Sequence, residues 1–351
     1  MPRPRAAAKQ VEERATATAA IEREPPGNES PMTTREGAIG VLMPRDIAAR
    51  HIVAFAQRAE AHGFDELWVV EDLGYRGGLV QAATVLAATA RVRVGVGLLP
   101  ASARNVAFTA MEIASLAQLH PGRIDIAVGH GMPSWMRSVG AWPKSPLTLL
   151  SEYITVLRSL LSGQLVDHEG QYVRIDGVQL HESATPAAAP PVLAGVRGPK
   201  SLAVSGQVAD GTLLAEPVAP AYVREALEHI APARPHRLVA YNIAAVDDDP
   251  SMALTAVRPA LDVVGEPDWQ PHVAPLPFHE DLAALRSRCD SPQEFTRTMP
   301  DEWVRQLAVA GTPDQARSRL ADLFDAGVNS AVLTPVGPDY LASLDSLAAV
   351  L

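Results

Sequence analysis

Cysteine, long uncharged apolar runs and basic residues are all scarce in this chain. Cys289 is the single cysteine among 351 residues, so no disulfide can form within the chain, and we expect a reducing, cytoplasmic setting. No stretch approaches the roughly 18 uncharged apolar residues of a membrane span. Lys and Arg number 30 against 40 Asp and Glu, which gives a net charge of -10. This balance argues against a polyanionic partner such as nucleic acid.

Large apolar side chains are almost absent from residues 1–36. This segment is rich in charges, prolines and small residues and lacks the apolar centre of a secretory signal. We expect residues 1–36 to form a flexible extension and residues 37–351 to form the folded domain. A short amphipathic helix over residues 7–22 is the alternative.

Beyond the extension, short apolar runs alternate with helical patterns. The strand candidates are residues 38–43, 66–71, 92–99, 123–129, 191–196, 211–216, 237–246 and 330–336. Continuously apolar strands separated by helices are typical of a parallel sheet that is covered on both faces. Eight such units favour the α/β class and a closed (β/α)8 TIM barrel. An open, doubly wound sheet is the alternative.

Capping residues mark the ends of several expected helices. Asp46 is the expected cap of the first helix and Gly63 its stop, and Asn105 is the expected cap of a helix over residues 105–119. Helices are also expected over 79–89, 146–162, 199–208, 220–231 and 313–326.

Three segments are additions to the strands and helices of a minimal barrel. Residues 130–145 form a long loop after the fourth strand, with two tryptophans, on the C-terminal rim where barrel enzymes keep their chemistry. Residues 164–180 are expected to form a small hairpin that turns at Glu169-Gly170. The proline-interrupted residues 247–300 are expected to fold over the same rim.

Glycines cluster at the ends of the expected strands. Gly129-His130-Gly131 ends the fourth strand and is either a tight turn or a place where a ligand approaches the backbone. Residues 195–200 place glycines between a strand and a helix, where free N–H groups and the helix dipole suit a phosphate. The glycine spacing is not the dinucleotide fingerprint, so a mononucleotide-type phosphate is favoured over NAD. A simple strand-to-helix loop is the alternative.

Several of these motifs, in this order, resemble the bacterial-luciferase-like flavin oxidoreductases. The segments "HPGRIDIAVGHG", "LLSEYITVLRSLLSGQLVDHEGQYVRI" and "PPVLAGVRGPKSLAVSGQVADGTLLAE" carry the resemblance. "ELWVVEDLGYRGGLVQAATVLAATARVRVGVGLLPASARN" looks like the branch that depends on the deazaflavin coenzyme F420 and includes methylenetetrahydromethanopterin reductase. The resemblance implies an oxidoreductase that uses coenzyme F420, or alternatively FMN, in the C-terminal mouth of the barrel.

The resemblance also implies a set of cofactor-binding residues. It places a non-prolyl cis peptide at Gly97-Leu98, behind the flavin ring. The strand-four wall and the phosphate loop complete the implied site: Gly97, Leu98, Gly129, His130, Gly131, Gly195, Val196, Arg197, Gly198, Pro199 and Lys200.

A reduction by a deazaflavin also needs a proton from the protein. The implied catalytic residues are His130, Asp72 and Glu71, and His130 is favoured because an imidazole titrates near neutral pH. Tyr75 and Glu216 are further candidates at the rim. His130 could instead only bind the cofactor. Glu71 and Asp72 could pair with Arg76 or Arg104, and Asp72 stands where the relatives often carry histidine.

The expected partners are a small-molecule substrate and a second copy of the chain. An FMN-dependent monooxygenase would also need a flavin reductase to supply its cofactor. The remaining alternative is a non-catalytic flavin-binding protein on the same barrel. No metal site is expected.

Overall fold

The computed structural model describes residues 37–351. The expected N-terminal extension and the alternative helix over residues 7–22 lie outside the described residues. None of the helices in residues 37–351 combines the length and the apolar character needed to cross a membrane.

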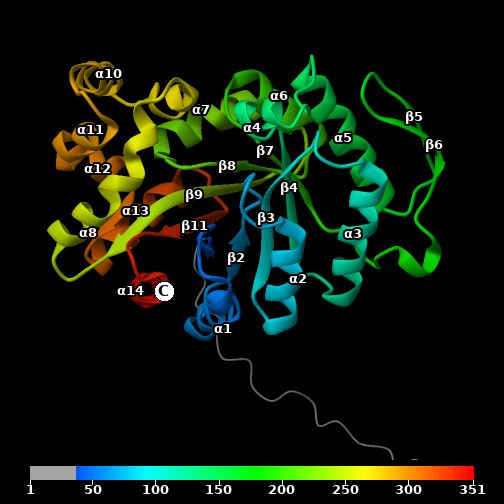
Figure 1. Cartoon of the computed structure of the whole chain (residues 1–351), viewed down its shortest axis with the longest axis horizontal. Helices are drawn as coiled ribbons and strands as arrows, with labels where there is room; N and C mark the ends of the chain where they lie inside the picture. Colours follow the sequence, from blue (N-terminus) through cyan, green and yellow to red (C-terminus); the bar gives the residue numbers. More distant parts are fainter. Residues whose placement is uncertain (1–36) are drawn as a thin grey trace, which may run out of the picture. The chain divides into compact units, whose positions relative to one another are not determined.

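Eight parallel strands form a closed barrel, as the sequence predicts (Figure 1). The sheet closes because β9 pairs with both β8 and β11. All eight strand candidates are confirmed as β1 (Ala38–Leu42), β2 (Glu66–Val69), β3 (Arg93–Pro100), β4 (Ile124–Gly129), β7 (Val192–Gly195), β8 (Gly211–Leu214), β9 (Arg237–Val246) and β11 (Ser330–Pro335).

Helices surround the strands and cover the outer face of the barrel (Figure 1). Their apolar side chains pack on the sheet, and α5 alone buries eight residues along one face. The covering helices are α1 (Ile52–His62), α2 (Gly78–Ala88), α3 (Val106–Leu119), α5 (Pro146–Leu161), α6 (Pro199–Val208), α7 (Pro220–Ile230), α13 (Pro313–Asp325) and α14 (Tyr340–Leu347).

Two of the three expected capping residues are confirmed. The Asn105 side chain accepts a hydrogen bond from the Ala107 amide, and Gly63 ends α1 in the left-handed conformation. The prediction for Asp46 is wrong. A 3-10 turn, η1 (Ala49–His51), precedes α1, so Asp46 lies too early in the chain. Its carboxylate accepts a hydrogen bond from the Tyr340 hydroxyl instead.

The barrel interior is filled in layers. At the N-terminal end of the strands lies a charged layer that contains Glu66, Asp125 and Arg237. Above it lies an apolar layer made of residues two positions further along the strands, including Trp68 and Val239. The interior is therefore a packed core that leaves only the C-terminal mouth for a ligand.

The first two insertions fold largely as expected. The loop after β4 contains the short helix α4 (Pro133–Ser138). The hairpin pairs β5 (Val166–Glu169) with β6 (Arg174–Val178), and the chain reverses directly after Glu169. The Glu152 carboxylate of α5 fixes this turn by accepting backbone N–H groups of residues 171–173.

The third insertion folds over the C-terminal rim, as expected. It carries its own apolar core, built around Phe295 and Val257, and appears beside α7 at one side of the barrel (Figure 1). A short extra strand, β10 (Val309–Gly311), returns the chain to the end of β9. Its elements are α8 (Pro250–Val257), η3 (Arg258–Gly265), η4 (Pro267–Trp269), α9 (Gln270–Val273), α10 (His279–Arg288), α11 (Pro292–Thr298) and α12 (Asp301–Leu307).

Candidate active site

The ends of β3, β4 and β7 converge on the Leu98 side chain. The Gly97-Leu98 peptide bond is cis, as the resemblance implies. A Cβ atom at Gly129 or at Gly195 would lie 2.6 Å from Leu98 Cδ2. The glycines at these two strand ends therefore make room for Leu98, which forms the floor of the mouth, rather than leaving bare backbone for a ligand.

Gly131 meets the requirements of a tight turn. Its φ is +70°, in the left-handed region that favours glycine, and a Cβ there would lie 2.8 Å from the sulfur of Met136. Both glycines of the Gly129-His130-Gly131 motif are thus explained by local steric requirements.

The loop between β7 and α6 is open toward the mouth. Gly198 has a φ of +78°, and a Cβ atom there would meet nothing within 4 Å. No side chain caps α6, and Pro199 occupies its first turn. The first-turn amides and the positive end of the helix dipole therefore remain available for an anion. Lys200 is exposed beside them, and Val196 is buried in the wall.

Arg197 is held at the rim by the third insertion. Its Nη1 donates to the Asp268 carbonyl at 3.2 Å, and its guanidinium lies 4.6 Å from the centroid of the Trp269 ring. Met132 lies on the other side, with its sulfur 3.9 Å from Nη2. Burial lowers the pKa of Arg197, opposed by Tyr222, Glu216 and Asp268 in that order, but an arginine stays charged at neutral pH.

His130 is engaged by its neighbours. Its Nε2 lies 3.0 Å from Ser201 Oγ in the first turn of α6, and a second hydrogen bond involves the backbone of Pro146 at the start of α5. Burial lowers the pKa of the imidazole, and the Pro146 bond only partly opposes this effect. Because burial disfavours the charged ring and Ser201 engages Nε2, this geometry favours a positioning role over proton transfer.

The acidic pair after β2 is also engaged. Glu71 forms an ion pair with Arg104, with Oε2 2.7 Å from Nη2, and accepts the Gly78 amide at 2.8 Å. Asp72 forms an ion pair with Arg45 at 2.9 Å. For Glu71 this geometry favours the alternative of pairing with Arg104, whereas Arg76 donates instead to the carbonyls of Arg45 and Ile47.

One residue of the mouth that the sequence analysis missed is Tyr241. Its hydroxyl is buried without a hydrogen-bond partner and contacts the backbone at Gly97, below the cis peptide. Thr334, on the neighbouring strand β11, also has a buried hydroxyl without a partner. The strand alternation contained a signal, because Tyr241 follows Arg237 and Val239 at every second position of β9 and so faces inward.

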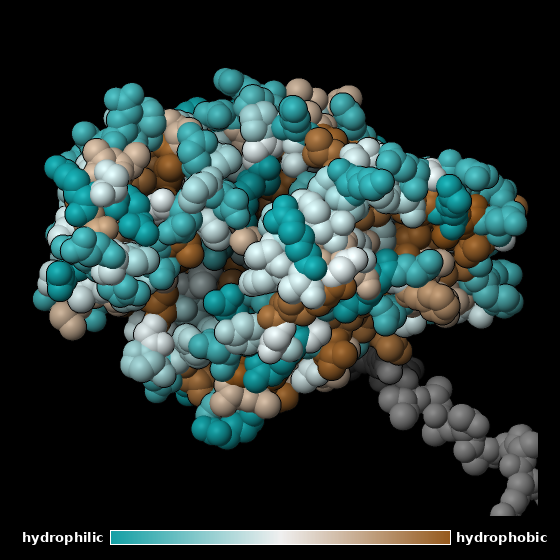
Figure 2. Space-filling view, turned by 45° about the horizontal axis from the view of Figure 1, so that its top comes forward, coloured by the Kyte–Doolittle hydropathy of each residue, from teal (hydrophilic) through white to brown (hydrophobic). Residues whose placement is uncertain are grey.

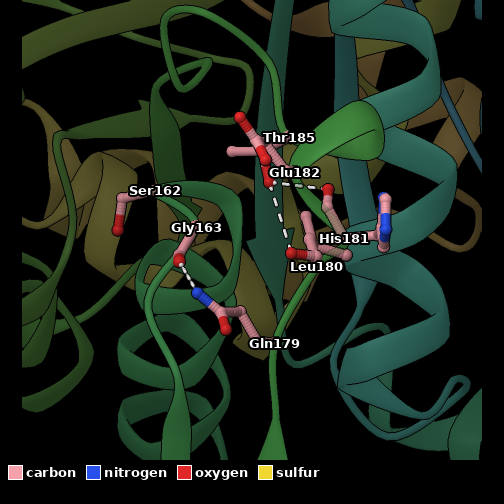
Figure 3. A pocket seen from close by; sticks show the side chains of 7 residues that line it. All are labelled: Ser162, Gly163, Gln179, Leu180, His181, Glu182 and Thr185. Carbon is pink, nitrogen blue, oxygen red and sulfur yellow. Dashed lines mark hydrogen bonds between the residues drawn. The ribbon is translucent and has the colours of Figure 1, made fainter.

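A surface cavity lies away from this mouth. About 790 Å³ in volume, it is formed by Ser162, Gly163 and the segment before β7. Figure 3 shows Gln179 donating to the Gly163 carbonyl at 2.7 Å across it. The polar groups drawn there mostly bond one another or backbone, and none of the expected site residues lines the cavity. We therefore place the candidate site at the mouth.

The fold and the rim together define a (β/α)8 barrel protein with an open, uncapped helix N-terminus after its fifth barrel strand, β7. Residues 26–330 match the sequence model of the family described as luciferase-like monooxygenase. The chain belongs to this family.

The similarity to several named relatives extends over most of the chain. A 5,10-methylenetetrahydromethanopterin reductase of Methanolobus tindarius is 28% identical over 302 residues, which cover 82% of this chain and 91% of the relative. An F420-dependent glucose-6-phosphate dehydrogenase of Mycolicibacterium gilvum is also 28% identical, covering 85% and 91%. The structure of the coenzyme F420 dependent tetrahydromethanopterin reductase of Methanopyrus kandleri superposes with a TM-score of 0.77 at 21% identity, covering 90% and 98%. This structural likeness confirms the fold.

Proposed function

We propose that the protein is an oxidoreductase that uses coenzyme F420 to transfer a hydride to or from a small organic substrate. The observation that carries the proposal is the joint presence, on one rim, of Leu98 after a cis peptide and an open, uncapped helix N-terminus at Gly198. The activities for which the relatives are named support the choice of F420 over FMN.

The residues at the mouth fit a cofactor with a planar ring and a phosphate-bearing tail. The orphaned hydroxyl of Tyr241 and the Leu98 floor lie where the ring would rest. The amides after Gly198 and the guanidinium of Arg197 would hold the phosphate. His130 orients this loop through Ser201. When bound, the deazaflavin would supply a carbon that carries the hydride, and the protein would supply orientation and a proton.

A direct test is a fluorescence titration of the full chain with F420 and, separately, with FMN. We expect saturable F420 binding, and we expect Arg197→Met to weaken it at least tenfold because a charge-assisted contact is lost. The matched control is Arg224→Met, which removes an exposed arginine of α7. FMN binding without any response to F420 would favour the alternative of an FMN-dependent monooxygenase that is fed by a flavin reductase. Cofactor binding without turnover of any imine, enone, ketone or alcohol would favour the non-catalytic alternative.

We also propose that the protein works as a homodimer in the cytoplasm. Apolar side chains are exposed on the neighbouring helices α2 and α3, where Val80 and Leu119 are each 73% exposed and Phe108 is 66% exposed. Hydrophobic groups also appear among the polar surface in the space-filling view (Figure 2). Light scattering of wild type and Phe108→Glu tests this part, because a charge in an apolar interface should produce monomers. The single cysteine supports a reducing compartment.

A further inference from the structure

Glu216 differs from the other candidate acids at the mouth in its lack of partners. Within residues 37–351, Glu71 is paired with Arg104 and Asp72 with Arg45, whereas the Glu216 carboxyl has no ion pair and bonds only its own backbone amide. Tyr75, the remaining candidate, is half exposed and lies under Arg45. A half-buried carboxyl whose hydrogen bonding is limited to its own backbone amide retains the capacity to bond an incoming group.

The charges around Glu216 place its carboxyl inside the mouth. Arg197 follows the neighbouring strand β7, but Asp72 and Arg45 follow β2 and β1 and also act on Glu216. In the strand order of the barrel, β1 and β2 lie opposite β7 and β8. The carboxyl therefore lies within electrostatic range of charged groups on both sides of the mouth. Tyr241, whose hydroxyl lies below the cis peptide, also interacts with it.

The backbone at Glu216 is held in place by the third insertion. Trp269 Nε1 donates to the Glu216 carbonyl at 3.0 Å, and His272 Nδ1 lies 3.1 Å from the Pro217 carbonyl. The Val218 amide donates to Asn242 Oδ1 at 3.1 Å. The backbone of residues 216–218 is thus fixed, while the Glu216 carboxyl has no side-chain partner. This is the pre-organisation that a proton-transfer group needs.

The surroundings also favour the protonated form of this carboxyl. Burial is the largest effect and raises the pKa of Glu216, and Asp72 raises it further. Arg197 and Arg45 act in the opposite direction. His272, at the back of the same loop, has its pKa lowered by burial to about 3 and therefore adds no positive charge at neutral pH.

We propose that Glu216 is the group that exchanges a proton with the substrate at the mouth. The inference rests on the proposed function. In the reducing direction, one atom of the substrate C=N, C=C or C=O bond gains the hydride from the reduced cofactor, and the other takes the proton of the Glu216 carboxyl. The π bond of the substrate and the carboxyl O–H bond break, the cofactor loses two electrons, and the carboxylate regains a proton from water. Oxidation runs through the same atoms in reverse.

The test compares wild type with Glu216→Gln and with a matched control, Glu228→Gln, which alters an exposed glutamate of α7. F420 fluorescence first measures binding, which Glu216→Gln should leave within about threefold. Turnover of reduced F420 with a panel of imines, enones and ketones should fall on the order of 10²- to 10⁴-fold in Glu216→Gln and stay unchanged in the control. The wild-type rate of reduction should fall as pH rises through the pKa of Glu216. In Glu216→Asp the rate should show the same kind of fall, with its midpoint at a different pH.

Infrared titration of the protein alone supplies a measurement that does not depend on turnover. We expect a carboxyl that titrates above the ordinary glutamate value of about 4.3, present in wild type and Glu228→Gln and absent from Glu216→Gln. Retained turnover in Glu216→Gln, or the same carboxyl titration in all three proteins, would overturn the assignment. Failure of wild type to bind F420 would instead overturn the proposed function, and the infrared measurement would still decide whether Glu216 holds a proton.

Discussion

The two ends of the barrel treat buried polar groups in opposite ways. At the N-terminal end, Arg237 bonds Glu66, Asp125 and Ser330, with 2.7 Å to Asp125 and 2.8 Å to Ser330. Glu66 also accepts the indole N–H of Trp68 at 2.8 Å.

At the C-terminal end, the hydroxyls of Tyr241 and Thr334 have no partner, and Glu216 has only its own amide. Burying an unsatisfied polar group costs free energy. The difference therefore indicates that the N-terminal end is built for stability and the C-terminal end for a ligand.

The largest expected effect comes from breaking the charged layer. Arg237→Met leaves the buried Glu66 without its arginine and Asp125 with Arg93 alone. We therefore expect the free energy of unfolding to fall by about 3 to 5 kcal/mol. Chemical denaturation followed by tryptophan fluorescence and circular dichroism measures this change. Arg317→Met is the control, because Arg317 is 47% exposed and its partner Asp314 is 92% exposed. We expect the control to lose less than about 1 kcal/mol, and equal losses in the two variants would refute the division between the ends.

Two tyrosine hydroxyls offer a sharper comparison at the level of single atoms. Tyr153 is buried and donates to Thr109 Oγ1 at 2.8 Å, so Tyr153→Phe leaves a buried acceptor without its partner and should cost about 1 to 3 kcal/mol. Tyr241→Phe removes a hydroxyl that has no partner, so stability without ligand should be unchanged or slightly higher. Thermal unfolding of the two variants and of wild type measures the direction of both stability changes. A clear loss in Tyr241→Phe would mean that its hydroxyl is satisfied in the folded protein.

The third prediction concerns pH and the insertion over the rim. Burial lowers the pKa of His272 to about 3 in the folded protein, below the value of about 6.5 in an unfolded chain. The unfolded state therefore binds the proton more tightly. The penalty is absent above about pH 6.5 and grows as pH falls toward 3, reaching about 2 kcal/mol at pH 5. Unfolding free energies measured at pH 7 and pH 5 should differ by less in His272→Asn than in wild type. The same difference in both proteins would assign the acid sensitivity to other groups.

Much of the barrel could be predicted from the sequence because its signals are local. A buried strand such as β4 is a mostly apolar run bounded by polar residues and glycine. The helix α5 is indicated by apolar residues at spacings of three and four. The resemblance further implied the cis peptide at Gly97-Leu98, which the structure contains.

The failures share a dependence on contacts between distant residues. Asp46 looked like a helix cap because Asp is a common cap, but its partner Tyr340 lies 294 residues away. The strand β10 was missed because three residues carry no period, and it exists only by pairing with the end of β9. For the same reason the engagement of His130 by Ser201, 71 residues away, and the isolation of Glu216 could not be read from their neighbours in the chain.

Two glycines at opposite ends of the barrel extend the comparison to the backbone. Gly198 on the rim and Gly122 before β4 have similar φ values of +78° and +72°, and a Cβ at either would meet nothing within 4 Å. Alanine should be destabilising at both positions, by about 1 to 3 kcal/mol, and more so at Gly198, whose φ of +78° and ψ of 150° fall in a region that is essentially restricted to glycine.

Only Gly198→Ala should also weaken F420 binding, since its methyl group enters the open side of the α6 loop where the phosphate is proposed to lie. Fluorescence titration of the two variants, under conditions in which both are fully folded, separates this effect on affinity from the effect of backbone strain. Equal affinities would show that the loop at Gly198 does not contact the cofactor, and the amides that follow it would then have to be satisfied by water, as at any exposed helix end.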